Sequence, residues 1–522
     1  MKISRFAEYL ARLEATTKRL EITSILSELI SELNQNEIDL GIYLALGYLK
    51  APFESQRFSI AEKMMIRILA NAYAGNSEED VTKLYKRDGD LGLVAAQIHK
   101  TTPKTTLELA EVYKYLYEIA TAQGTGSQEL KVQKATELLK NLDRESAKYI
   151  VRMVLGTTRL GFTELTVIDA LSSFLGAGKT LREKIEAIYA VHPDIGLIAK
   201  KLKESGIEGI SEITIETGVP ILAQKAQRYG SIEETFEKIQ DCWAEFKFDG
   251  TRVQLHMDKS KKVESSELEL FESQPKFLIK TFTRNLEETT HQFPDIAEAA
   301  AKDLKAKSVI LDGEAMGYDK KTGEFLPFQE IMQRKRKHSI KEMADEIPVM
   351  YFVFDILYLD GKTLLNKTLE ERHEILEKVI GDSTVIKAAT FLRTTNQDEL
   401  FDYYEKAKEQ NLEGLIVKTP AGAYQAGARS YSWVKLKKAD EKLLSDSIDA
   451  VVLGYYAGRG ARSKFGIGGF LIGVYDEQTD SFKTVSKVGT GLKDEDWEFL
   501  KKESEKFIIK KVPANVDLPK QY

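Results

Sequence analysis

Two short alternating stretches meet at a tight turn near the middle of the chain. Trp243–Lys247 and Thr251–Met257 both alternate like half-buried strands, and Asp249-Gly250 lies between them. Lys247 comes just before the turn, where a long amine can project into a cavity. The alternative interpretation is an edge lysine beside an Asp-Gly hairpin turn.

The neighbours of Lys247 suit a lysine that attacks phosphorus. Such a lysine must exist partly as the free amine, which burial and a nearby guanidinium favour, and it needs cations that hold the phosphates. Glu245 lies two residues before Lys247 on the same strand face, and Arg252 lies five residues after it.

Composition limits the class of protein. A chain of 522 residues with 43% hydrophobic and 30% charged residues predicts about three globular domains. No window approaches about 18 uncharged apolar residues, and the charged N-terminus predicts an amphipathic helix rather than a signal peptide. Cys242 is the single cysteine, which excludes an intrachain disulfide and a cysteine-rich zinc site. We therefore expect a cytoplasmic protein, nucleoid-associated if prokaryotic, without a membrane partner.

Periodicity divides the chain into parts. Residues 1–205 show apolar residues at helical spacing and predict an all-α domain. Residues 206–230 are broken by glycines and predict a linker with a short extended piece, and a second linker is expected at 440–448. Residues 231–444 mix strand and helix patterns and predict an α+β domain, whereas 445–522 are strand-rich and predict a partial β-barrel of the OB-fold type.

Further charged or aromatic motifs follow Lys247. Asp312 and Glu314 close an apolar strand, where carboxylates suit a ribose hydroxyl or a metal, although a solvated turn is the alternative. Phe354 lies at the polar end of another apolar strand and is suited to stacking on a purine. Lys435 and Lys437 share one strand face, where they repel each other unless an anion such as phosphate lies between them; a merely solvated strand is the alternative.

The order of the motifs is more specific than any one of them. Between Lys247 and Lys437 the chain reads Lys-x-Asp-Gly-x-x-Arg, Thr-Arg-Asn, Asp-Gly-Glu, Phe-Asp-Ile-Leu, Glu-Gly-x-x-x-Lys and Lys-Leu-Lys. This series resembles the covalent nucleotidyltransferases, and most closely the ATP-dependent DNA ligases of the archaeal and eukaryotic replicative type. The resemblance covers essentially the whole chain. It implies an all-α DNA-binding domain, an α+β nucleotidyltransferase (ATP-grasp-like) domain and an OB-fold domain.

The resemblance also implies roles for individual residues. Lys247 would be the nucleophile that takes AMP, Glu245 would read the adenine edge and Phe354 would stack on its ring. The residues expected to hold the nucleotide are Glu245, Arg252, Arg284, Glu314, Phe354, Lys418, Arg429, Lys435 and Lys437. Those expected near Mg²⁺ are Glu413 and Glu314. The Arg-Leu-Gly element at Arg159–Gly161 resembles part of the family's DNA-binding domain, so Arg159 and Gly161 are expected to contact DNA. Separately from the resemblance, the basic run Gln333-Arg-Lys-Arg-Lys-His338 makes Arg334 and Arg336 candidate DNA phosphate contacts, with a solvated face as the alternative.

The implied activity is the sealing of nicks in double-stranded DNA with ATP and Mg²⁺, in replication, repair and recombination. AMP would pass from Lys247 to the 5′-phosphate of the nick, and the 3′-hydroxyl would then displace it. We expect a monomer that contacts the DNA backbone rather than the bases, with a sliding clamp as a further partner.

Two departures from the family pattern stand out. Met257–Lys280 is longer than usual and predicts an extended β-hairpin or surface insert. The chain stops at Tyr522 without the family's basic C-terminal motif, so we expect a truncated ligase whose self-adenylylation is impaired. The alternatives are an RNA ligase or capping-type guanylyltransferase, and a non-catalytic DNA-binding clamp. An NAD-dependent ligase does not fit, because one cysteine cannot build that family's tetracysteine zinc site.

Overall fold

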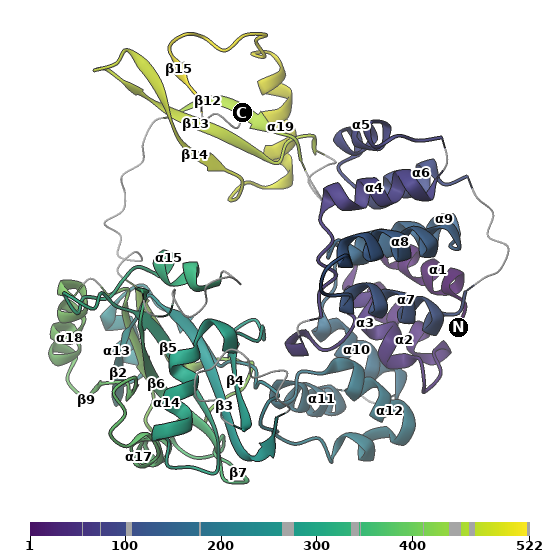
Figure 1. Ribbon diagram of the computed structural model, residues 1–522. Helices are drawn as coiled ribbons and strands as arrows, with labels where there is room; N and C mark the ends of the chain where they lie inside the picture. Colours follow the sequence, from purple (N-terminus) through teal and green to yellow (C-terminus); the bar gives the residue numbers. More distant parts are fainter. Residues whose placement is uncertain are drawn as a thin grey trace. The chain divides into compact units, whose positions relative to one another are not determined.

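The computed structural model describes the chain except residues 55, 74, 101–106, 177–178, 264–275, 336–343, 345, 411, 438–449, 459–464 and 519–522. The chain forms two compact units (Figure 1). One comprises Met1–Lys50, Gln56–Gly176 and Ser445–Tyr522, and the other comprises Ala51–Ser55 and Ala177–Leu444.

The N-terminal region is helical, as predicted. Its helices bury apolar stripes against one another, and side-chain caps such as Ser77, Asp90 and Asp143 begin three of them. The α-helices are α1 (Ile3–Glu14), α2 (Arg19–Glu32), α3 (Ile38–Leu46), α4 (Glu62–Ala72), α5 (Glu78–Asp88), α6 (Leu91–Ile98), α7 (Leu109–Thr121), α8 (Ser127–Lys140), α9 (Arg144–Val154) and α10 (Glu164–Phe174).

The next two helices, α11 (Lys179–Val191) and α12 (Ile195–Ile210), belong to the second unit. The change of unit therefore comes earlier in the chain than the domain boundary expected near residue 205. Backbone hydrogen bonds give the reason: the Leu222 amide donates to the Ala190 carbonyl (2.8 Å), and the Gly427 amide donates to the Leu222 carbonyl (2.9 Å).

The segment expected as a linker, residues 206–230, is packed rather than free. It begins inside α12 and ends in β1 (Lys225–Arg228), which pairs in parallel with β11 (Arg429–Lys437). Ile221 and Gln224 between them are buried. The expected linker at 440–448 lies outside the described residues.

Two sheets form the body of the second unit. The five-stranded sheet has the order β1-β11-β10-β2-β9 and adds β2 (Cys242–Lys247), β9 (Phe391–Thr394) and β10 (Gly414–Lys418) to the strands already named. The other sheet has the order β4-β3-β5-β6-β7, with β8 on β6. Its strands are β3 (Thr251–Lys262), β4 (Phe277–Thr283), β5 (Ser308–Gly317), β6 (Val349–Leu359), β7 (Lys362–Thr363) and β8 (Ile386–Ala388).

The Asp249-Gly250 turn carries the chain from one sheet to the other. β2 and β3 do not pair, so the alternative of an edge lysine in a hairpin is wrong; β2 lies between β9 and β10. A Cβ on Gly250 would lie 2.4 Å from the Ala315 carbonyl oxygen, so the turn requires glycine.

Helices cover both sheets. α14 (Pro294–Asp303) and α17 (Leu369–Ile380) contact the six-stranded sheet, and their apolar residues join its core. α13 (Ile232–Lys238) and α18 (Gln397–Glu409) do the same for the five-stranded sheet. The predicted hairpin at 257–280 is confirmed where the structure describes it, because β3 and β4 pair antiparallel up to Lys262 and Phe277.

The C-terminal segment forms a four-stranded sheet in the order β12 (Val451–Tyr456), β13 (Gly469–Asp476), β14 (Ser481–Val488), β15 (Val516–Asp517). Trp497 of α19 (Asp494–Glu505) stacks on Phe470 of β13, with ring centroids 5.9 Å apart. The described residues show this sheet rather than a closed barrel, so the OB fold stays a prediction. No described helix has the length and apolar character to cross a membrane.

Candidate active site

Three strands of the five-stranded sheet bring Lys247, Glu413 and Lys437 together. Gly414 pairs with Lys247 on one side and with Lys437 on the other. Glu413, the residue before Gly414, extends its Oε2 to an ion pair with the Lys247 Nζ, and the same oxygen lies 3.1 Å from the Lys437 Nζ. A Cβ on Gly414 would lie 2.1 Å from the Leu436 carbonyl oxygen, so only glycine allows this approach.

Charge sets the protonation of the acids around Lys247. Burial alone would raise the pKa of Glu413, but hydrogen bonds and attraction from Lys247 and Lys437 hold it below its ordinary value. The pKa of Asp249, at the turn, is raised by burial and by repulsion from Glu413. Glu413 is therefore an anion between the two cations Lys247 and Lys437, whereas the sequence predicted a phosphate between Lys435 and Lys437.

Glu314 approaches the same group from the other sheet. It pairs with Arg252 across β3 and β5 and with Phe352 across β5 and β6. Burial and repulsion from Asp312 and Glu413 raise the pKa of Glu314 to about 7, against attraction from Lys247 and Arg252. The expectation that these acids end a strand is corrected, because β5 continues to Gly317.

A second, buried group lies further along β2 and β10. The Lys418 Nζ is 2.6 Å from Glu245 Oε2, and the Trp243 indole donates to Glu245 Oε1 (3.0 Å). The same Nζ lies 4.8 Å from the centre of the Phe354 ring. Lys418 is only 1% exposed, so the structure places it against Glu245 and Phe354 rather than beside Lys247. Phe354 is internal to β6 rather than at its end.

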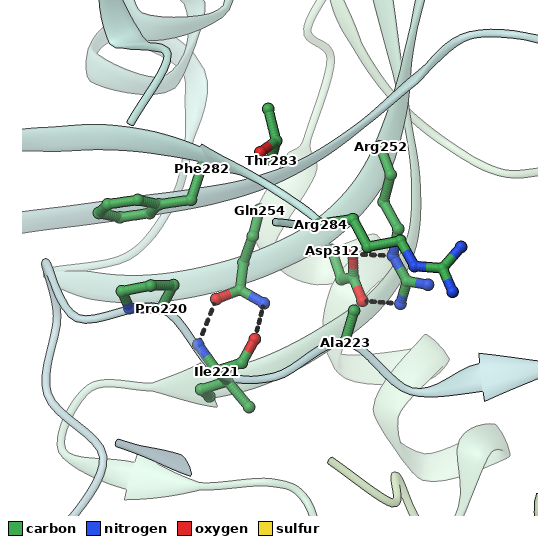
Figure 2. A pocket seen from close by; sticks show the side chains of 9 residues that line it. All are labelled: Pro220, Ile221, Ala223, Arg252, Gln254, Phe282, Thr283, Arg284 and Asp312. Carbon is green, nitrogen blue, oxygen red and sulfur yellow. Dashed lines mark hydrogen bonds and ion pairs between the residues drawn. The ribbon is translucent and has the colours of Figure 1, made fainter. Parts of the chain in front are cut away.

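Arg252 and Arg284 line one small pocket (Figure 2). The Arg252 guanidinium donates to both oxygens of Asp312 (3.0 and 2.6 Å) and to the Gln224 carbonyl (2.9 Å). Asp312 also accepts from the Tyr424 hydroxyl (2.8 Å). Arg284 follows β4 at the exposed rim, and no ion pair joins it to a described residue.

The remaining predicted phosphate ligands lie on β11. Lys435 and Lys437 occupy alternate positions of the strand, and Arg429 begins it and is exposed. Burial and repulsion from Lys437, Arg429, Lys247 and Arg284 lower the pKa of Lys435. Each of these cations, including Arg284 at the end of β4, therefore acts on the charge of Lys435.

The structure places the predicted DNA contacts in different environments. Arg334 is buried and its guanidinium binds Asp295 (2.8 Å), so its assignment as a DNA contact is corrected to a core ion pair. Arg159 donates to Asp90 Oδ2 (2.7 Å) and to the Gly89 carbonyl, which points its charge at the protein. Gly161 has φ +72° and open space around it, and Arg336 lies outside the described residues.

Some residues of the site were not predicted. Gln224 and Tyr424 were missed because nothing near them in the chain signals a role, and each acts through partners that are distant in sequence. Asp312 was noted, but not as the partner of Arg252. Its spacing of two from Glu314, on the same strand face, was the available signal.

Comparisons with known proteins agree with this geometry. Residues 2–172 match the family model for the DNA ligase N terminus, and residues 273–437 match that for the ATP dependent DNA ligase domain. The chain is 38% identical over 517 residues to the probable DNA ligase of Dictyoglomus turgidum, covering 99% of this chain and 86% of the relative. It is 36% identical to the DNA ligase of Sulfolobus acidocaldarius, covering 96% and 83% of the two chains.

A solved structure named Pmar-Lig_PreS3 has a similar fold, with a TM-score of 0.55 at 16% identity over 96% of this chain and 91% of that one. The relatives are DNA ligases, which decides against an RNA ligase or a capping enzyme. From its order of motifs, its fold and these relatives, the chain belongs to the ATP-dependent DNA ligases, the enzymes that seal nicks in DNA.

Proposed function

We propose that Lys247 is the nucleophile that carries AMP between ATP and the nick. The observation that supports this most is the cluster of Lys247, Glu413 and Lys437 at the shared ends of three strands, with Glu314 facing it from the second sheet. The Lys247 nitrogen would form a bond to the α-phosphorus as pyrophosphate leaves. Its proton must leave before or during attack, and Glu413 is the base in contact with it.

The neighbouring cations would neutralise the phosphate. Phosphoryl transfer depends on positioning and on charge stabilisation. Lys437 shares Glu413 with Lys247, and the charges of Lys437, Arg429, Lys247 and Arg284 all act on Lys435. Lys437 must exchange its contact with Glu413 for one with phosphate when the nucleotide binds.

The adenine base and the ribose would lie toward the side chains of Glu245, Phe354 and Arg252. Glu245, held by Lys418 and Trp243, is a candidate acceptor for the exocyclic amine of adenine, and Phe354 is a candidate stacking partner. Arg252, fixed by Asp312, would contact the ribose or a phosphate.

The donor set fits Mg²⁺. Glu314 and Glu413 are carboxylates that influence each other's charge across the site, and Mg²⁺ prefers oxygen ligands from one or two carboxylates together with substrate phosphates. When bound, the ion supplies positive charge to the phosphate oxygens. Burial raises the pKa of Glu314 despite the attraction of Lys247 and Arg252, and a divalent cation bound beside it would favour its charged form.

The substrate we propose is nicked double-stranded DNA, held by its backbone. Loops of the helical region leave room for a phosphate to approach the main chain closely, because they contain glycines with positive φ and nothing within 4 Å of the position that a Cβ would occupy. These glycines are Gly124, Gly126, Gly156 and Gly161. A monomeric state, a sliding-clamp partner and the OB fold of the C-terminal segment stay predictions.

The test uses Lys247→Arg, which keeps the charge beside Glu413 but provides no attacking amine. On an ordinary nick with ATP and Mg²⁺ it should not seal, whereas on a nick already adenylated at its 5′-phosphate it should seal close to the wild-type rate. Failure on both substrates would show that Lys247 is needed for more than carrying AMP. Sealing on both would show that another residue is the nucleophile.

A further inference from the structure

Alternate side chains of β3 bind the segment that precedes β1. We call residues 217–224 the strap. Because side chains of a strand alternate between faces, residues 252, 254, 256 and 258 of β3 point the same way, and each makes a hydrogen bond with the strap. In chain order the pairs are Thr217 with Asp258, Gly218 with His256, Ile221 with Gln254, and Gln224 with Arg252.

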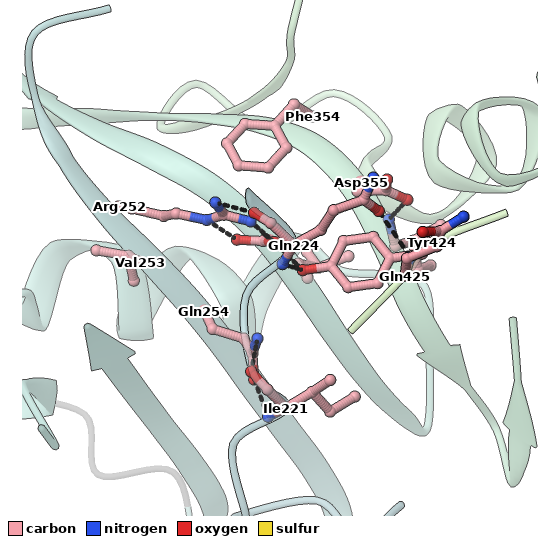
Figure 3. Close-up of polar contacts among 12 residues, drawn as sticks. Ile221, Gln224, Arg252, Val253, Gln254, Phe354, Asp355, Tyr424 and Gln425 are labelled. Atoms are coloured by element: carbon pink, nitrogen blue, oxygen red, sulfur yellow. Dashed lines mark hydrogen bonds and ion pairs between the residues drawn. The ribbon is translucent and has the colours of Figure 1, made fainter. Parts of the chain in front are cut away.

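We call this series of four contacts the ladder. In its middle, the polar side-chain atoms of Gln254 and His256 all have hydrogen-bond partners, and Figure 3 shows the contact between Gln254 and Ile221. Gln254 accepts from the Ile221 amide (2.7 Å) and donates to the Ile221 carbonyl (3.0 Å). His256 Nδ1 accepts from the Gly218 amide (3.1 Å), so its Nε2 carries the proton and donates to Gln254 Oε1 (2.9 Å). His256 therefore sets which way round the Gln254 amide lies.

These polar groups are buried, which makes their bonds costly to lose. Gln254, His256 and Asp258 are all buried, and an unpaired buried polar group destabilises a fold. Burial lowers the pKa of His256 to about 3, so the ring stays neutral and keeps its acceptor at any working pH.

The ladder ends at the small pocket lined by Arg252 and Arg284. Gln224 is fully buried; its carbonyl accepts from Arg252, its amide donates to the Tyr424 hydroxyl, and its side chain accepts from the Gln425 amide. Pro220, Ile221 and Ala223 of the strap form one wall of the pocket that holds Arg252 and Arg284.

We propose that Gln254 and His256 are positioning residues for ligation: they fix the strap, and the strap in turn fixes Arg252 toward the nucleotide. This rests on the proposed role of Arg252. Misplacing a contact group by about 1 Å can slow a reaction about a hundredfold, so this indirect route has a measurable effect.

The experiment measures single-turnover sealing of a nick already adenylated at its 5′-phosphate, at a temperature at which each variant is folded. Gln254→Met keeps the length of the side chain and should slow sealing by about ten- to a hundredfold. His256→Phe is a second, independent variant with the same expected direction. The matched control is Leu255→Ala, on the same strand but in the core, which should lower Tm at least as much and leave the rate within about threefold.

Combining Gln254→Met with Arg252→Ala separates positioning from a general effect. If Gln254 acts through Arg252, the double variant should seal no more slowly than Arg252→Ala alone. Effects that multiply, or a control that slows sealing equally, would overturn the proposal. If Arg252→Ala seals slowly and Gln254→Met seals at the wild-type rate, the positioning proposal is overturned while the role of Arg252 stands. If Arg252→Ala seals at the wild-type rate, both the proposed role of Arg252 and the positioning proposal are wrong.

Discussion

The buried contact between Asp312 and Arg252 offers a sharp test of how the site is held. Asp312 is 1% exposed at its side chain and Arg252 is 19% exposed, and two hydrogen bonds join them. Asp312→Asn keeps the shape of the side chain, and its oxygen can still accept a hydrogen bond from the Tyr424 hydroxyl, but the Arg252 guanidinium loses the carboxylate that it donates to. Removing one partner of a buried pair costs about 3–5 kcal/mol, and the partial exposure of Arg252 favours about 3 kcal/mol.

That loss should be visible as a lower melting temperature. For a unit of this size, about 2–4 °C per kcal/mol predicts that the Tm of Asp312→Asn falls by about 6–12 °C in scanning calorimetry. Adding Arg252→Met removes the stranded charge and should recover about 2 kcal/mol, because replacing both partners of such a pair is often close to neutral.

Stability and activity should then separate. The double variant is expected to be nearly as stable as wild type and still defective in sealing, since the proposed contact of Arg252 with the nucleotide is gone. A loss below about 1 kcal/mol for Asp312→Asn, or no recovery in the double variant, would refute the reasoning that Asp312 compensates a buried charge.

Three further predictions follow from the same geometry. Glu314 binds its proton more tightly in the folded protein than in the unfolded chain, because its folded pKa is raised to about 7. Without metal and nucleotide, its contribution to the free energy of unfolding should therefore fall by about 3 kcal/mol as the pH rises from about 4.5 to 7. Urea unfolding across this range should show the slope, and Glu314→Gln should reduce it. Glu413→Gln should raise the Mg²⁺ concentration for half-maximal sealing at least about tenfold in a titration; an unchanged midpoint would exclude Glu413 as a ligand. Arg334→Ala should lower the free energy of unfolding by about 3 kcal/mol, because Asp295 is left unpaired. It should leave the salt dependence of DNA binding unaltered, and a weaker salt dependence in the variant would show that Arg334 contacts DNA after all.

Local pattern was enough to single out the residues of the charged cluster around Lys247. The strand before Lys247, the glycine after Glu413 and the alternation of Lys435 and Lys437 are all visible in short windows, and the structure brings three of these four side chains into one charged cluster. The helical N-terminal region was equally clear, because its apolar spacing persists over many turns.

What the pattern missed depends on partners far apart in the chain. Alternation shows that a segment is a strand but not which sheet it joins, so the change of sheet at Asp249-Gly250 resembled a hairpin. A run of basic residues looks exposed, and only the fold shows that Arg334 reaches Asp295. The strap looked like part of a linker because Gly218 and Pro220 break the periodicity, while the side chains that hold it belong to β3.

Whether AMP becomes attached to Lys247 is the most direct test of the proposed mechanism. The protein would be incubated with Mg²⁺ and ATP labelled in the α-phosphate, without DNA, beside Lys247→Arg, and the labelled peptide identified by mass spectrometry. We expect an acid-labile label on the peptide that contains Lys247, even if self-adenylylation is slow, and none on the variant. A label that persists on Lys247→Arg, or that maps to another residue, would contradict the proposed mechanism.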